Sequence, residues 1–232
     1  MDDLSVIFPV YNERKTIERV LQDWDTQLTK LKIPFRIIVC EDGSTDGTSQ
    51  LLRQLVKRFG IKLLQRPQRS GYASAVTRGI KAAQTAYVLC VDSDGQCDPG
   101  DVFNFWQKRS EAQVLLGFRK ARVDSLSRKL FSLLFKRVFS FLFDASIRDP
   151  SCPYVLFRPG VIVSFLDKLT LMREGFWWGF TGCSIKNRLS IKQIPVHHRA
   201  RFDGQTNVYQ LPKIPSIALR NMTGLIRLKF FT

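Results

Sequence analysis

The stretch "YVLCVDSDGQCDPGD" (87–101) joins a short apolar run to a turn that carries four carboxylates. The apolar run predicts a buried strand, because it contains β-branched residues and is followed at once by Asp, Ser and Gly. The acids need an explanation, because the chain of 232 residues has a formal net charge of +16.

Strand-like runs alternate with helical patterns on the N-terminal side of this stretch. We expect strands over 4–10, 35–41, 61–65 and 87–92, and helices over 16–28, 45–60 and 72–84. Beyond it we expect strands over 114–119, 153–159 and 191–198, and helices over 125–144 and 214–231. The pattern predicts an α/β fold with a mostly parallel sheet flanked by helices. Because no repeat or linker divides the chain, we expect one domain over residues 1–232.

Polar stretches follow three of the expected strands, namely "YNER" (11–14), "EDGSTDGT" (41–48) and "DSDGQCD" (92–98). Ligands of such sheets bind beyond the carboxyl ends of the strands, so the three stretches should face one crevice. Asp92, Asp94 and Gln96 would offer hard oxygen ligands there, suited to Mg²⁺ or Mn²⁺ held against a diphosphate. The alternative is turn and cap chemistry, which we expect of Asp98 before Pro99.

The positive charge is concentrated in the second half of the chain. Residues 1–101 hold 14 basic and 13 acidic side chains, whereas residues 102–232 hold 22 and 7. This asymmetry indicates an anionic partner, which is phosphate, nucleic acid or an acidic membrane surface. The N-terminal "MDDLSVIF" does not resemble a signal peptide and no apolar run is long enough to span a bilayer, so we expect a cytoplasmic protein. The five cysteines form no CxxC pair, and with only two histidines a zinc site is not expected. Cys40 and Cys90 lie in strand-like runs and are expected to be small buried thiols.

Four segments resemble, in order and spacing, the family 2 glycosyltransferases of the GT-A (Rossmann-like) fold. They are "VIFPVYNE" (6–13), "VCEDGSTDGT" (39–48), "RSGYASAVTRG" (69–79) and "CVDSDGQ" (90–96). Within the family the chain is most similar to polyprenyl-phosphate sugar transferases such as dolichol-phosphate mannose synthase. The resemblance is strong over about the first 120 residues and weaker beyond them. Where such synthases commonly read "TSGF" and carry a late Lys, this chain has "SCPY" (151–154) and Asn207.

The resemblance implies a nucleotide-diphosphate sugar donor bound by residues 1–120, with Mg²⁺ or Mn²⁺ as cofactor. The residues it implies for the nucleotide are Pro9, Tyr11, Glu13, Asp42, Gly71, Asp92 and Ser93, and the metal ligands are Asp92, Asp94 and Gln96. For Tyr11 an aromatic cap on the core is an equal alternative. In the acceptor half, Arg201 is expected over the donor diphosphate, and Arg119, Arg128 and Ser132 at an acceptor phosphate.

The chemistry of the acceptor can also be argued from the residues. A hydroxyl acceptor needs a general base, whereas a phosphate acceptor is already ionised and needs guanidinium contacts. The second half is rich in Arg and poor in acids, with Asp149 as the one candidate base. The composition therefore favours a phosphate acceptor. Together with the resemblance, this predicts an inverting transferase acting on a polyprenyl phosphate, and a hydroxyl of a glycan or glycolipid is the alternative acceptor.

Two readings outside this class remain to be weighed. A basic nucleic-acid-binding protein would leave the acids of 92–101 unexplained and lacks the usual motifs, so we expect no nucleic-acid partner. A catalytically inactive nucleotide-sugar binder is disfavoured because Asp92, Asp94 and Gln96 are all present.

Two expected helices combine apolar and basic residues with no acid. The segment 126–143 carries the pairs Arg128/Lys129 and Lys136/Arg137, and the C-terminal helix carries Arg220, Arg227 and Lys229. Such helices suit shallow burial at an anionic interface, so we expect peripheral binding to the inner face of the membrane. The alternative is that they pack on the sheet or on a second subunit.

Overall fold

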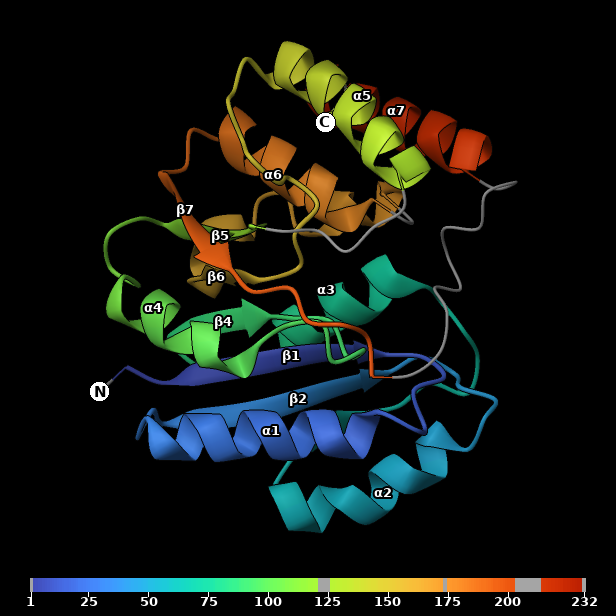
Figure 1. Ribbon diagram of the computed structural model, residues 1–232, viewed down its shortest axis with the longest axis vertical. Helices are drawn as coiled ribbons and strands as arrows, with labels where there is room; N and C mark the ends of the chain where they lie inside the picture. Colours follow the sequence, from blue (N-terminus) through green and yellow to red (C-terminus); the bar gives the residue numbers. More distant parts are fainter. Residues whose placement is uncertain (1, 121–125, 173–174, 203–213, 231–232) are drawn as a thin grey trace.

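The computed structural model describes residues 2–120, 126–172, 175–202 and 214–230, with only the backbone at 126–132, 134, 214 and 215. The described residues build one seven-stranded sheet with helices on both faces (Figure 1). The strands are β1 (Leu4–Val10), β2 (Phe35–Glu41), β3 (Lys62–Leu64), β4 (Tyr87–Cys90), β5 (Val114–Arg119), β6 (Val155–Phe157) and β7 (Ile191–Val196). The helices are α1 (Ile17–Lys30), α2 (Thr48–Phe59), α3 (Tyr72–Ala82), α4 (Val102–Gln107), α5 (Leu126–Phe143), α6 (Phe176–Lys186) and α7 (Ile214–Phe230). Short 3₁₀ turns are η1 (Pro99–Asp101), η2 (Pro159–Ile162) and η3 (Asp167–Leu171).

The strand order is β3-β2-β1-β4-β6-β5-β7, and every pairing is parallel except those of β6. The expected α/β fold with a mostly parallel sheet is confirmed. Because β6 runs antiparallel to both β4 and β5, those two strands point the same way. The carboxyl ends of β1, β2, β4, β5 and β7 therefore lie along one edge of the sheet, which is where ligands of such sheets bind.

Alternation along β1 divides the core into two layers. Leu4, Val6 and Phe8 pack with α1, α2 and α4, whereas Ile7 packs on the opposite face with residues of α3, α5, α6 and α7. This period of two follows from the pleat, which turns successive side chains to opposite faces of the sheet.

The helix α6 was not expected from the sequence. It is buried along most of its length, including Phe176, Trp177, Trp178 and Phe180, so it lacks the polar face by which an amphipathic helix is recognised. The helices α5 and α7 pack against it and lie farther from the sheet (Figure 1). They form a helical layer over the sheet face opposite α1 and α2.

All five cysteines are free and buried, as the sequence predicted for Cys40 and Cys90. Burial raises the pKa of Cys40 and of Cys152 to about 12, so neither thiol ionises at neutral pH.

Close packing of α3 on the sheet generates a stability prediction. A Cβ at Gly79 would lie 2.5 Å from Ile7 Cγ2 and 2.7 Å from Cys40 Sγ, both in the sheet core. Alanine in a helix interior usually stabilises by about 0.5–1 kcal/mol relative to glycine, but overpacking of a core costs about 1–3 kcal/mol. We expect Gly79→Ala to lower the free energy of unfolding by about 1–2 kcal/mol in urea titrations. Gly160→Ala, where a Cβ meets nothing within 4 Å, is the matched control and should be neutral.

Candidate active site

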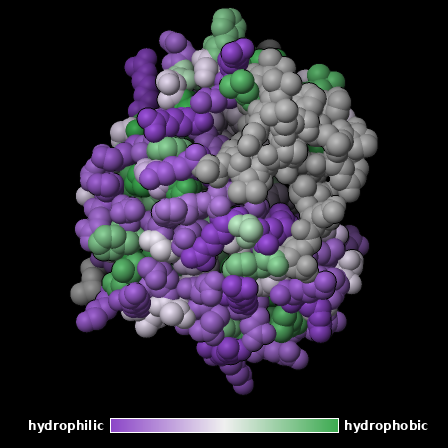
Figure 2. Space-filling view, viewed as in Figure 1, coloured by the Kyte–Doolittle hydropathy of each residue, from purple (hydrophilic) through white to green (hydrophobic). Residues whose placement is uncertain are grey.

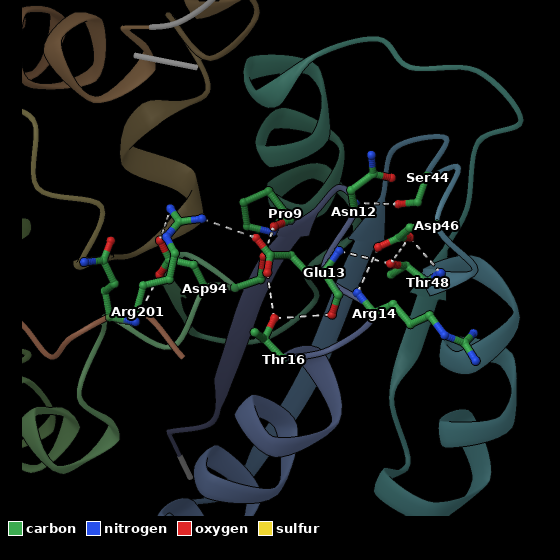
Figure 3. A network of polar contacts seen from close by, with 12 residues as sticks. Pro9, Asn12, Glu13, Arg14, Thr16, Ser44, Asp46, Thr48, Asp94 and Arg201 are labelled. Carbon is green, nitrogen blue, oxygen red and sulfur yellow. Dashed lines mark hydrogen bonds and ion pairs between the residues drawn. The ribbon is translucent and has the colours of Figure 1, made fainter. Parts of the chain in front are cut away.

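Three loops meet beyond the carboxyl ends of β1, β2 and β4. The backbone N–H of Asn12 donates to Ser44 Oγ at 3.0 Å, that of Glu13 to Thr48 Oγ1 at 3.0 Å, and that of Arg14 to Asp46 Oδ2 at 3.1 Å (Figure 3). These bonds tie the loop after β1 to the loop after β2.

The loop after β4 joins the same group through Ser93. Its buried hydroxyl donates to the carbonyl oxygen of Pro9 at 2.8 Å. The polar stretches 11–14, 41–48 and 92–98 therefore border one region, as the topology predicted.

Asp94 lies at the centre of this region and is only 7% exposed. Its Oδ1 accepts from the backbone N–H of Gln96 at 3.0 Å, and its Oδ2 accepts from Arg201 Nη2 at 2.7 Å. Arg201 also approaches Glu13, with 3.9 Å between Nη1 and Oε1 (Figure 3). Burial raises the pKa of Glu13, and the hydrogen bond from Thr16 Oγ1 works against that rise. Arg201 thus bridges two carboxylates that come from β1 and β4.

The Asp92 carboxylate accepts a hydrogen bond from a tyrosine hydroxyl. Tyr72 Oη donates to Asp92 Oδ1 at 2.7 Å. The pKa of Asp92 is raised to about 7. Burial is the main cause and the neighbouring carboxylate of Asp94 adds to it, whereas Tyr72, Arg119 and Arg201 work against the rise. The carboxylate of Asp94 is therefore close enough to disfavour the charge of Asp92.

The chemistry of these donors fits a divalent cation. No cluster of three or more His, Cys, Asp or Glu side chains suited to a metal occurs among the described residues. Mg²⁺, however, is commonly held by one or two carboxylates together with phosphate oxygens of a substrate. Two mutually repelling carboxylates at the strand end are such a pair. The Gln96 amide lies beside them, with Nε2 3.4 Å from the carbonyl oxygen of Arg199, and its role as a ligand stays a prediction.

Asp42 binds the turn that leads into α3. Its carboxylate, 3% exposed, accepts from the backbone N–H of Ser70 at 3.1 Å, from Ser70 Oγ at 2.6 Å and from the N–H of Gly71 at 2.7 Å. It thereby fixes the turn before α3, where Gly71 has φ +95°. A direct contact of Asp42 with a base or ribose remains a prediction. Tyr11 lies nearby, partly exposed, with the Arg69 guanidinium 4.0 Å from its ring centroid.

At the carboxyl end of β5, Arg119 and Asp149 form a bidentate ion pair. Arg119 Nε and Nη2 donate to Asp149 Oδ2 and Oδ1 at 2.6 and 2.9 Å, and Nη2 also donates to Ser151 Oγ at 2.8 Å. The pair is almost buried, and Arg119 lines a small pocket together with Asp92 and Gln96. Arg119 thus lies on the same edge as the carboxylates of β4. The side chains of Arg128 and Ser132 lie outside the described residues, although both positions belong to α5.

Residues 197–202, which we call the strap, pair with the acidic stretch one side chain at a time. His197 Nδ1 lies 2.8 Å from Asp101 Oδ1, Arg199 Nη2 donates to Asp98 Oδ1 at 2.7 Å, and Arg201 donates to Asp94. The backbone N–H groups of Arg199 and Phe202 donate to the carbonyls of Gln96 and Asp94. Gly95, with φ +81°, leaves room for the Phe202 ring, which a Cβ would meet at 2.5 Å.

The strap accounts for three of the four acids in the opening stretch, and sequence reasoning missed it. The signal is the alternation of basic residues at 197, 199 and 201, which in an extended segment point to one side. Sequence reasoning also missed the roles of Asp98 and Asp101 as strap partners, although Asp98 does cap η1 by accepting from the N–H of Gly100 at 2.8 Å.

Comparisons with known proteins agree with this architecture. A dolichyl-phosphate beta-glucosyltransferase of Dictyostelium discoideum is 27% identical over 252 residues, covering 97% of this chain and 77% of the relative. A dodecaprenyl-phosphate galacturonate synthase of Rhizobium johnstonii is 26% identical over 165 residues, covering 69% of this chain and 49% of the relative. This chain's match therefore spans about half the length of the Rhizobium relative.

Solved structures show the same fold. A glucosyl-3-phosphoglycerate synthase from Mycobacterium tuberculosis, crystallised with Mn²⁺, UDP and glucosyl-3-phosphoglycerate, superposes with a TM-score of 0.67 at 21% identity, covering 98% of this chain and 80% of that one. A mannosyl-3-phosphoglycerate synthase from Rubrobacter xylanophilus gives a TM-score of 0.66 at 12% identity, covering 97% and 73%. At such identities the likeness concerns the fold alone, which is the GT-A arrangement.

The family model for glycosyl transferase family 2 matches residues 5–163, a span that contains β1 to β6 and the three loops of the site. The carboxylates at the end of β4 thus lie inside the matched region. The chain belongs to glycosyl transferase family 2 and is a glycosyltransferase.

Proposed function

We propose that this glycosyltransferase moves a sugar, with inversion, from a nucleotide-diphosphate sugar to a polyprenyl phosphate at the cytoplasmic face of a membrane. The observation that carries the donor part is the pair of carboxylates after β4, half-buried Asp92 and buried Asp94, with the Arg201 guanidinium bound to Asp94. The proposed acceptor is supported by the names of the Dictyostelium and Rhizobium relatives, a dolichyl-phosphate beta-glucosyltransferase and a dodecaprenyl-phosphate galacturonate synthase.

For the donor, we propose that Asp92, Asp94 and Gln96 hold Mg²⁺ or Mn²⁺. The cation would neutralise charge that develops on the leaving diphosphate. Arg201, paired with Asp94, would offer its guanidinium to the same phosphates. The nucleotide pocket would be lined by Pro9, Tyr11, Glu13, Asp42, Gly71 and Ser93. Residues 1–120 would form the donor half, and residues 121–232 the acceptor half, of one domain.

For the acceptor, the pairing of Asp149 argues against a hydroxyl. A general base must be available to accept a proton, but both carboxylate oxygens of Asp149 accept hydrogen bonds from Arg119. A phosphate acceptor needs no base, because it is already ionised. We propose that Arg119, Arg128 and Ser132 receive that phosphate. A glycan or glycolipid hydroxyl is the alternative acceptor.

The reaction is tested with a panel of labelled nucleotide sugars, Mg²⁺ or Mn²⁺ and a polyprenyl phosphate in detergent. Label should move into a product that extracts into organic solvent and is released by mild acid. Transfer only to a glycan or glycolipid acceptor would support the alternative, and no transfer from any donor would contradict the proposal.

The carboxylate at the centre of the site gives a sharper prediction. Asp94→Ala should lower the transfer rate by about 100-fold or more, because it removes a ligand of the proposed cation and the partner of Arg201. Circular dichroism should remain that of the native protein. Asp98→Asn is the matched control, since Asp98 belongs to the same acidic stretch but pairs with Arg199 and caps η1. Near-normal transfer by the Asp94 variant would place the cation elsewhere.

The layer of α5 and α7 supports binding at a membrane surface. Its described residues include exposed apolar side chains, namely Leu133, Phe141, Leu219, Ile226 and Phe230, with Phe141 88% exposed. Exposed Arg137, Arg220 and Arg227 lie on the same two helices, which carry no acid. The face shown in Figure 2 is mostly hydrophilic, with hydrophobic side chains scattered over it, some of them at the top, where α5 and α7 lie in Figure 1. Among the described residues, no helix is both long and apolar enough to cross a bilayer.

We therefore expect salt-sensitive, peripheral binding to anionic liposomes. Lys136→Glu with Arg137→Glu on α5 should weaken binding about tenfold or more in cosedimentation, because each basic residue near an anionic surface contributes about 1 kcal/mol. Arg53→Glu with Lys57→Glu makes the same charge change on exposed positions of α2, at the opposite end of the molecule (Figure 1), and should have little effect. Equal losses in both variants would mean that only net charge matters, and no binding of the native protein at low salt would contradict the interfacial model.

A further inference from the structure

The hydroxyl of Tyr72 lies between two groups that fix the direction of its hydrogen bonds. Trp177 Nε1 donates to Tyr72 Oη at 2.7 Å, and Tyr72 Oη donates to Asp92 Oδ1 at 2.7 Å. An indole N–H can only donate, so the phenol must use a lone pair toward Trp177 and keep its proton for another acceptor. That acceptor is the carboxylate at the end of β4.

Both aromatic rings are held by their neighbours. The Tyr72 ring packs edge-on against Phe176, with centroids 6.3 Å apart. The Trp177 ring packs edge-on against Phe176 and Phe180, at 5.0 and 5.5 Å. Trp177 is 5% exposed. The hydroxyl therefore has little freedom to leave Asp92, because the phenol ring that carries it and the indole that donates to it are both held by packing.

The three residues come from separate elements. Tyr72 begins α3, Trp177 lies in the first turn of α6, and Asp92 follows β4. The chain of hydrogen bonds thus runs from the buried helix that supports α5 and α7 to the donor side of the sheet edge. Tyr72 lies in the segment "RSGYASAVTRG", and Trp177 lies in a helix that the sequence did not predict.

We propose that Tyr72 is a positioning residue that orients the Asp92 carboxylate, and that Trp177 in turn orients Tyr72. This inference rests on the proposed function insofar as Asp92 lies at the donor diphosphate. A carboxylate beside Asp94 gains from a donor that fixes its orientation, because the outer partners of such ligands commonly change affinity or activity 10- to 100-fold when they are removed.

The test uses variants that remove single polar groups and keep the rings. Tyr72→Phe removes the hydroxyl, and Trp177→Phe removes the indole N–H. The matched control is Tyr87→Phe, because Tyr87 is a buried tyrosine at the start of the same strand β4 whose hydroxyl accepts from Arg158 instead. We expect Tyr72→Phe to lower kcat/KM for sugar transfer about tenfold relative to Tyr87→Phe. Trp177→Phe should lower it less, and the double variant should be no worse than Tyr72→Phe alone, because both groups act through one chain.

A second readout does not depend on turnover. The indole ¹H–¹⁵N signal of Trp177, assigned as the one missing from Trp177→Phe, should move in Tyr72→Phe and stay in place in Tyr87→Phe. In the native protein it should also move when Mg²⁺ is added with UDP or GDP, and this response should be lost in Tyr72→Phe.

The outcomes separate the inference from the proposed function. If the native protein transfers sugar and Tyr72→Phe matches Tyr87→Phe, the inference is overturned and the function stands. If losses in the double variant simply add, the two residues act independently and the chain is overturned. If no donor is turned over but the Trp177 signal responds to Mg²⁺ and nucleotide in the native protein alone, the inference stands and the function fails.

Discussion

Two carboxylates that are two residues apart, one half-buried and the other buried, require positive charge beside them. Asp92 and Asp94 are such a pair at the carboxyl end of β4. The pKa of Asp92 is raised to about 7, chiefly by burial, which shows that its charged form is disfavoured there. Arg201 supplies part of this positive charge by binding Asp94. It belongs to the strap, in which Arg199 pairs with Asp98 and His197 with Asp101. Three of the four acids of 92–101 are thus paired in space with basic residues that lie about a hundred positions farther along the sequence.

The antiparallel strand β6 brings the two halves of the chain to one edge. Val155 pairs with Cys90 on one side and with Leu116 on the other, so β6 separates β4 from β5 by a single strand. Arg119 is then the last residue of β5, at the same edge at which Asp92 follows β4, and both line one small pocket.

The sequence predicted the first half of the fold well, because each strand and helix there shows its own period. Leu4–Val10 and Thr48–Phe59 lie close to the strand and helix expected from apolar runs and glycine stops. The helix α6 was not predicted because it is apolar on all sides and therefore shows no amphipathic pattern. The position of β6 in the sheet was not predicted because strand order depends on pairings between distant segments. The strap and the ion pair of Arg119 with Asp149 also depend on contacts between distant segments. They were not predicted because the sequences "RDPS" and "HHRAR" do not indicate which residues they contact. The acids of 92–98 were identifiable because strand ends of a parallel sheet meet wherever the chain goes next.

The five buried thiols divide between the two faces of the sheet. Cys97 and Cys152 belong to the layer of α1 and α2, whereas Cys40, Cys90 and Cys183 belong to the layer of α3 and α6. Since only an ionised, accessible thiol reacts with an alkylating reagent, each cysteine reacts when its own surroundings open. The native cysteines are therefore reporters of local opening on both faces of the sheet. Mass spectrometry of alkylated peptides could measure the rate of local opening in each layer without any engineered label.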